Sequence, residues 1–89
     1  MFVIEDESHS DMIGEYGILE DALVELRKRA KLPWDGELNR APCQGWEKCG
    51  RKYHIIEYDK STMPFIEKQR QEVLRISAKE VYWNPQFVA

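Results

Sequence analysis

Two cysteines in the middle of the chain are the residues best suited to chemistry. Cys43 and Cys49 flank Trp46, and the five residues between them include Gly45. A disulfide would close a short loop here, and Gly45 gives that loop the flexibility that disulfide geometry requires. So short a cross-link removes on the order of 2–3 kcal/mol of unfolded-state entropy, which is a useful but not a decisive stabilisation.

The spacing gives weaker support to two other uses of the same cysteines. Thioredoxin-like redox chemistry uses Cys-x-x-Cys at the start of a helix, and these two cysteines lie further apart. A zinc site would take His54 as a third ligand and His9 or a carboxylate as a fourth, but the five-residue gap lies outside the usual two to four. His9 lies in a polar segment, where we expect it to be solvated. Two reduced, structural thiols are therefore expected, with no metal and no cofactor, and a redox switch or thiol-dependent enzyme using Cys43 and Cys49 is the alternative.

Aromatic rings and cations interleave around the cysteines and form a second constellation, one suited to binding. Its members are Trp34, Arg40, Trp46, Lys48, Arg51, Lys52 and Tyr53. Trp, Tyr and Arg dominate the energetic hot spots of protein interfaces, and Arg donates in pairs to carboxylates. An acidic protein partner is therefore expected. An intramolecular alternative stays open, in which the cations pair with the chain's own acidic residues and the tryptophans belong to the core.

The uneven distribution of charge helps to choose between classes of partner. Residues 1–25 contain eight acidic residues and no basic one, whereas residues 40–52 carry a net charge of +3. The whole chain has a net charge of −3, and nucleic-acid binders usually carry a clear positive excess. Single-stranded nucleic acid, whose bases would stack on the rings, is therefore a weaker alternative than a protein partner.

Motifs of the common enzyme classes are missing from the sequence. It has no nucleophile elbow, no phosphate-cradling glycine loop and no His-Glu-x-x-His. A non-catalytic protein-binding or regulatory module is therefore expected. No apolar run approaches the roughly 20 residues of a membrane span, and the first residues do not resemble a secretory signal. We accordingly expect a cytoplasmic protein with reduced thiols. The sequence gives no expectation for the oligomeric state.

One amphipathic helix is predicted over residues 17–31. Apolar residues recur there at steps of three and four and form one stripe: Ile18, Leu19, Ala22, Leu23, Leu26 and Ala30. Acidic residues in the first turn and basic residues in the last complement the helix dipole, and Glu25 can pair with Arg29. Pro33 ends the helix.

The segment that follows, residues 32–50, has neither a helical nor a strand period. Long irregular segments are uncommon in small domains unless they are functional, disordered or tied down. Disorder is disfavoured because Trp34, Leu38 and Trp46 are costly to leave in water. We therefore expect an ordered loop that is folded onto the body of the protein and carries the function.

The remaining residues predict a small sheet. Residues 1–4, 52–59, 73–78 and 81–83 have strand-like composition or alternation, and residues 5–15 are expected to form an exposed, mobile loop. The predicted fold is α+β, with one helix packed on a mostly antiparallel sheet of three or four strands. All 89 residues form one domain in this prediction: an acidic segment (1–15), the helix (17–31), the structured loop (32–50) and a β-rich region (51–83).

Overall fold

The computed structural model describes residues 1–87 of the chain. Within that range the chain forms one helix, α1 (Leu19–Ala30), and five strands: β1 (Phe2–Asp6), β2 (Asp11–Tyr16), β3 (Arg51–Asp59), β4 (Ile66–Ile76) and β5 (Val81–Trp83). Short 3-10 turns cover Glu7–His9, Trp46–Lys48 and Pro85–Phe87. The strands form one sheet in the order β2-β1-β3-β4-β5, and every neighbouring pair is antiparallel. The α+β class is therefore confirmed.

The sheet has five strands, so the predicted number of three or four is wrong. The additional strand is β2, which lies within the segment that the sequence predicted as a mobile loop and pairs along β1. The polar composition of β2 and its Gly14 are not typical of a strand. Strand β2 is ordered by its pairing with β1. Ser10 adopts the left-handed conformation with φ of 50° and turns the chain from β1 toward β2.

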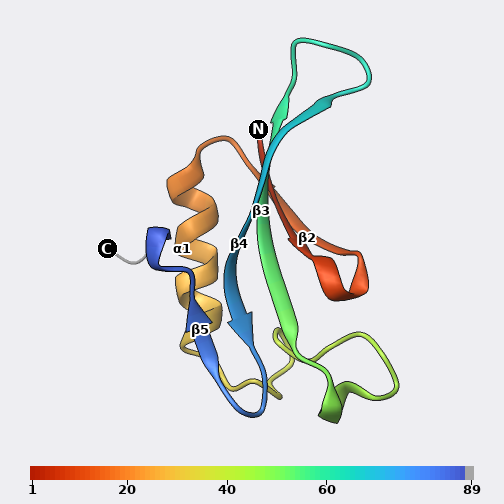
Figure 1. Ribbon diagram of the computed structural model, residues 1–89, viewed down its shortest axis with the longest axis vertical. Coiled ribbons are helices and arrows are strands. Elements are labelled where there is room, and N and C mark those ends of the chain that lie inside the picture. Colours follow the sequence, from red (N-terminus) through yellow and green to blue (C-terminus); the bar gives the residue numbers. More distant parts are fainter. Residues whose placement is uncertain (88–89) are drawn as a thin grey trace.

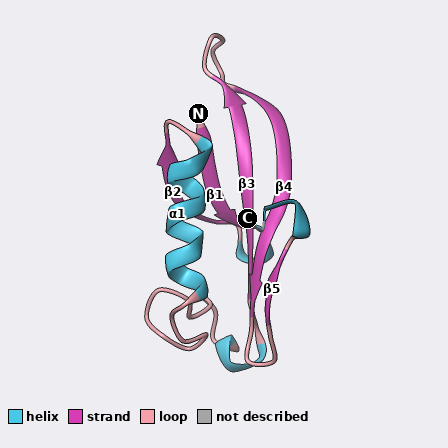
Figure 2. Cartoon of the chain, turned by 90° about the vertical axis from the view of Figure 1, so that its left-hand side faces the viewer, coloured by secondary structure: helices cyan, strands magenta, loops and turns pink. Residues whose placement is uncertain are grey.

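Helix α1 covers one face of the sheet, as Figure 2 shows. Ala22, Leu23 and Leu26 of the helix are buried against Ile4 and Ile55 of the central strands. The predicted helix is thus confirmed within two residues at each end. Its first turn differs from the prediction, because Ile18 and Leu19 are exposed and take no part in the buried core.

Ion pairs cover the other face of the sheet where no helix does. Val3 and Ile56 are buried there, and the side chain of Arg70 pairs with Glu5 at 2.8 Å and with Glu67 at 3.1 Å. A long arginine stem can shield apolar surface while its guanidinium stays near water. The first half of β4 is therefore charged and exposed. For this reason its sequence is ambiguous between a strand and a helical turn at residues 65–66 and predicts no strand over residues 67–72.

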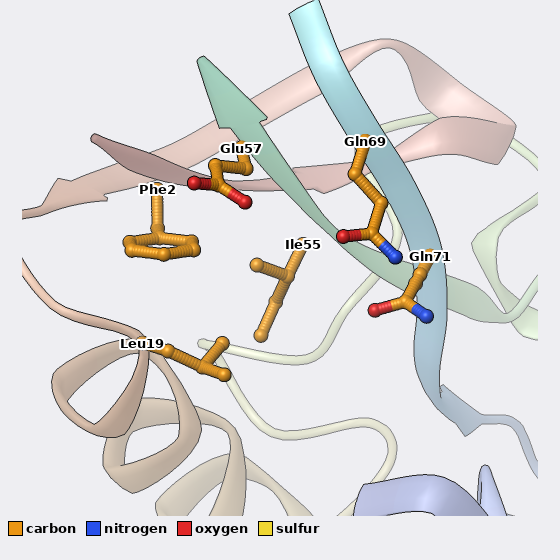
Figure 3. A pocket seen from close by; sticks show the side chains of 6 residues that line it. All are labelled: Phe2, Leu19, Ile55, Glu57, Gln69 and Gln71. Atoms are coloured by element: carbon orange, nitrogen blue, oxygen red, sulfur yellow. The ribbon is translucent and has the colours of Figure 1, made fainter. Parts of the chain in front are cut away.

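A small pocket marks the place where α1 no longer covers β3 and β4. It has a volume of about 140 Å³, and Figure 3 shows its lining: Phe2, Leu19, Ile55, Glu57, Gln69 and Gln71. Three lining side chains are apolar and three are polar, because this half of the β3–β4 hairpin extends past the helix. None of them is a cysteine or histidine, so the pocket is separate from the residues that the sequence singled out.

The 32–50 loop lies at one end of the elongated molecule, and the turn between β3 and β4 lies at the other (Figure 1). The molecule measures 40 × 31 × 18 Å. The predicted loop is confirmed as an irregular segment that contains only the short turn at Trp46–Lys48. Among the described residues, no helix combines the length and the apolar character needed to cross a membrane.

Candidate binding loop and thiol–imidazole cluster

Buried polar side chains hold the 32–50 loop against the helix and sheet. The side-chain amide of Asn39 donates to the carbonyls of Arg29 (2.9 Å) and Pro33 (3.1 Å), at the end of α1. Arg29 in turn donates to the carbonyl of Leu38 at 2.8 Å. The carbonyls of Arg29 and Pro33 also accept from the backbone N–H groups of Leu32 and Gly36, so Asn39 adds a second donor to each. The loop and the helix end therefore stabilise each other.

Arg51, predicted to contact a partner, is instead buried and forms internal contacts. Its guanidinium pairs with Asp6 at 3.1 Å and with Asp11 at 2.8 Å. It also donates to the carbonyls of Asn39 and Arg40. A buried guanidinium is costly unless carboxylates and hydrogen bonds surround it. The intramolecular alternative therefore holds for Arg51, whose side chain is not available to a partner in this structure.

Tyr53 is likewise fully buried and is not available to a partner. Its hydroxyl donates to Oδ1 of Asn39 at 3.0 Å and accepts from Nη1 of Arg29 at 3.1 Å. Burial raises the pKa of Tyr53, and the hydrogen bond from Arg29 opposes that rise. Tyr53 therefore joins β3, α1 and the loop at one buried point.

The other predicted contact residues remain accessible at the end of the molecule. Trp34 and Trp46 are half-buried, with ring centroids 5.8 Å apart at an angle of 41°. The guanidinium of Arg40 lies 4.5 Å from the ring centroid of Trp46. Arg40, Lys48 and Lys52 are exposed. The rings and one cation thus form a stack, which we call the Trp–Arg stack (Trp34, Trp46 and Arg40).

Within the described residues, Arg40 differs from the other arginines because it has no carboxylate partner. The chain has six arginines, and the other five pair with carboxylates: Arg27 with Glu20, Arg29 with Glu25, Arg51 with Asp6 and Asp11, Arg70 with Glu5 and Glu67, and Arg75 with Glu72. Among residues 1–87, Arg40 has no ion pair within 4.0 Å, and its side chain donates only to the carbonyl of Asp35, at 3.4 Å. Stacking fixes its position without using most of its donors.

A wider pocket lies beside the loop, between the turn at Trp46–Lys48 and the β4–β5 turn. Its volume is about 370 Å³, and its lining residues are Glu47, Lys48, Cys49, Ser77, Ala78 and Lys79. Two lysines and one glutamate give its rim a net positive charge. The pocket and the Trp–Arg stack belong to the same loop.

The two cysteines lie side by side as free thiols, with 3.0 Å between their Sγ atoms. A hydrogen bond with Cys43 raises the pKa of the Cys49 thiol, and burial and the nearby carboxylates of Asp6 and Glu47 raise it further. Since the thiolate is the nucleophile, a raised pKa lowers reactivity near neutral pH. The arrangement therefore lowers the reactivity of Cys49 in particular.

His9, rather than His54, lies beside the cysteines. One ligand atom each from His9, Cys43 and Cys49 lies within 4.8 Å of the others. The expectation that His9 is solvated is wrong, because only 13% of its side chain is exposed. His54 alternates with the core-facing Tyr53 and Ile55, so it points to the other face of the sheet.

Asp6 and Asn39 are site residues that the sequence analysis did not identify. Asp6 is fully buried and accepts from the ring of His9 at 2.6 Å, from the backbone of Ser8 and from the backbone of Lys52. The one local signal was an aspartate placed three residues before a histidine at the end of a strand. Asn39 carries no comparable signal, because its partners are distant in sequence.

Comparison with protein-family models, with curated proteins and with solved structures found no match. The fold and the loop therefore define the protein only as a small single-domain α+β protein.

Proposed function

We propose that the protein is a small, non-catalytic binding module that recognises an acidic peptide segment of a partner protein through its 32–50 loop. The observation that carries this proposal is Arg40, which is exposed, stacked on Trp46 and without a carboxylate partner among the described residues. Every other arginine of the chain pairs with a carboxylate. Arg40 therefore has donors left for a carboxylate supplied from outside.

The residues around Arg40 support the same proposal. Trp34 and Trp46 offer partly exposed rings, and buried aromatic anchors dominate the affinity of protein interfaces. The adjoining pocket places Lys48 and Lys79 where a second acidic side chain can enter. Arg51 and Tyr53 would not contact the partner. They hold the loop in place from the protein interior through hydrogen bonds to Arg40 and Asn39.

Nucleic acid is the weaker candidate for the same surface. The exposed cations here are few, since Arg51 is neutralised by Asp6 and Asp11. Asp35, Glu37 and Glu47 are also exposed on the loop, so its cations are interspersed with carboxylates and form single contact points rather than a continuous positive track for a phosphate backbone. Affinity for nucleic acid depends on neutralising several phosphates at once, which this charge balance does not provide.

To test the proposal, the chain is titrated with an acidic peptide rich in Asp and Glu. Binding is monitored through the NMR signals of the indole N–H groups. We expect Trp34 and Trp46 to shift and Trp83, which lies on β5, to stay unchanged. Arg40→Ala should weaken binding at least about tenfold, equivalent to about 1.4 kcal/mol. Arg40→Lys should weaken it as well, because lysine lacks the planar fork.

The matched control is Lys60→Ala, which removes an exposed cation near the β3–β4 turn at the opposite end of the molecule. It should leave peptide affinity unchanged. Equal affinity of the Arg40→Ala and unchanged proteins would refute the proposal. Tighter binding to an oligothymidylate, with affinity that falls steeply as salt rises, would favour nucleic acid instead.

A further inference from the structure

Three metal-binding side chains from distant parts of the chain converge beside the loop. His9 comes from the turn between β1 and β2, and Cys43 and Cys49 come from the 32–50 loop. Their ligand atoms lie within 4.8 Å of one another. All three residues are partly buried, so the cluster is shielded from bulk water while a small ion can still reach it.

A buried carboxylate holds one ring nitrogen of His9. Its Nδ1 group donates to Oδ2 of Asp6 at 2.6 Å, which leaves Nε2 as the nitrogen that can bind an ion. A carboxylate on the far ring nitrogen fixes the tautomer and raises the basicity of a metal-binding histidine. Asp6 is itself fixed, because it is fully buried and bonded to Arg51 and to two backbone N–H groups.

We propose that His9, Cys43 and Cys49 bind a zinc ion, with a water molecule as the fourth ligand. Two thiolates and an imidazole are donors that zinc prefers, whereas Ca²⁺ and Mg²⁺ prefer oxygen. Two thiolates and one Zn²⁺ sum to zero charge, and the two thiol protons pass to solvent as the ion binds. The site therefore adds no net charge beside the buried Asp6–Arg51 pair.

The positions of the donors require only a small adjustment. With bonds of about 2.3 Å to sulfur, the two sulfur atoms of a tetrahedral zinc site lie roughly 3.8 Å apart. The Sγ atoms here are 3.0 Å apart, so rotation of the two cysteine side chains provides the difference. The turn at Trp46–Lys48 folds the intervening residues back, with the N–H of Cys49 bonded to the carbonyl of Trp46. That turn makes the unusual five-residue gap compatible with one ion.

The ion would join the loop to the β1–β2 turn. It would hold residues 43–49 at both ends, and Trp46 of the Trp–Arg stack lies between them. The site stands on geometry of its own, so the zinc proposal and the binding proposal can fail independently.

The test uses the full chain, reduced and kept without oxygen, and titrates it with Co²⁺ as a spectroscopic substitute for zinc. We expect one Co²⁺ per chain, sulfur-to-cobalt charge-transfer bands, intense tetrahedral d–d bands and displacement by Zn²⁺. Cys43→Ser and Cys49→Ser should remove the charge-transfer bands in part, and His9→Gln should weaken Co²⁺ affinity by more than about 100-fold.

The matched control is His54→Gln, which changes the other histidine and should leave the spectrum and affinity as they were. Thermal melts of the unchanged protein supply a second measurement, because an ion that binds the folded state raises the melting temperature as its concentration rises. The proposal is overturned if the reduced chain gives no charge-transfer band, if two chains share one ion, or if His54→Gln weakens binding as much as His9→Gln. Closure of both thiols into a disulfide that persists in the reduced preparation would overturn it as well.

Discussion

The side chain of Arg51 shows how one residue can have a very different role from the one its type suggests. Its position in a basic, aromatic segment predicts an interface contact. In the structure it links four backbone or side-chain partners: Asp6, Asp11 and the carbonyls of Asn39 and Arg40. Its energetic role is therefore to compensate the buried carboxylate of Asp6, which is fully excluded from solvent.

Replacing Arg51 by alanine should destabilise the fold by about 3–5 kcal/mol, because Asp6 would remain buried without its cation. Urea denaturation followed by circular dichroism measures this loss as a lower midpoint at an unchanged slope. The neighbouring Lys52→Ala change removes an exposed cation and should alter stability by no more than about 0.5 kcal/mol. A loss below about 1 kcal/mol for Arg51→Ala would contradict the structural role.

At the scale of elements, the close approach of β3 to the end of β4 fixes how the loop enters the sheet. Gly50 is the last residue before β3, and a Cβ at this position would lie 2.7 Å from the carbonyl oxygen of Ile76 and 2.9 Å from Cβ of Ser77. Both distances are too short for a real Cβ, and the nearer atom is backbone. The requirement for glycine therefore comes from space rather than from an unusual φ.

Gly50→Ala should consequently destabilise the protein by about 1–3 kcal/mol through overpacking. Gly45→Ala is the matched control, since a Cβ there meets no atom within 4 Å. Parallel thermal melts should show a clear drop for the first variant and little change for the second. Equal melting temperatures would mean that β3 and β4 can separate at this end without cost.

At the scale of the whole molecule, Tyr53 connects the three units that make up the fold. Tyr53 lies on β3. Its hydroxyl accepts a hydrogen bond from Arg29 of α1 and donates one to Asn39 of the loop. The helix covers one face of the sheet, and charged side chains such as Arg70 cover the other. Tyr53 lies within the buried core between the helix and the sheet, so we expect it to contribute to the global stability.

Global stability should decrease at alkaline pH because burial raises the pKa of Tyr53 above its ordinary value. Below pH about 10 both folded and unfolded states keep the phenol proton, so the contribution is fully present. Above that pH the unfolded state releases the proton first, and stability is lost as pH rises through the folded pKa. Burial raises the pKa of Tyr16 as well, and this acts in the same direction.

Urea midpoints measured from pH 8 to pH 12 test this expectation. Tyr53→Phe should cost about 1–3 kcal/mol at neutral pH, because Oδ1 of Asn39 would lose the hydroxyl that donates to it. The same variant should show a flatter decline above pH 10. Tyr82→Phe, with an exposed ring, should keep the full decline, and an equally steep decline in Tyr53→Phe would contradict the assignment.

Local patterns were enough to predict much of the fold. The apolar stripe of Ala22, Leu23 and Leu26 predicted helix α1, and the segment around Ile55 and Ile56 predicted strand β3. Helix α1 buries its apolar residues at the helical period, so their spacing reveals it. Strand β3 is buried on both faces, and its β-branched and aromatic composition reveals it instead. The ordered loop followed from the cost of exposing its tryptophans.

Only the tertiary structure decided the rest, because the deciding contacts join residues far apart in the sequence. Strand β2 and the first half of β4 are polar, and their order comes from pairing with β1 and β3. Asp6 and Arg51 are 45 residues apart, and their pairing determines that the guanidinium faces inward. The choice of His9 over His54 beside the cysteines depends on the same folding of the β1–β2 turn onto the loop. A periodic pattern records which face of an element is buried, but it does not record which distant side chain will meet that face.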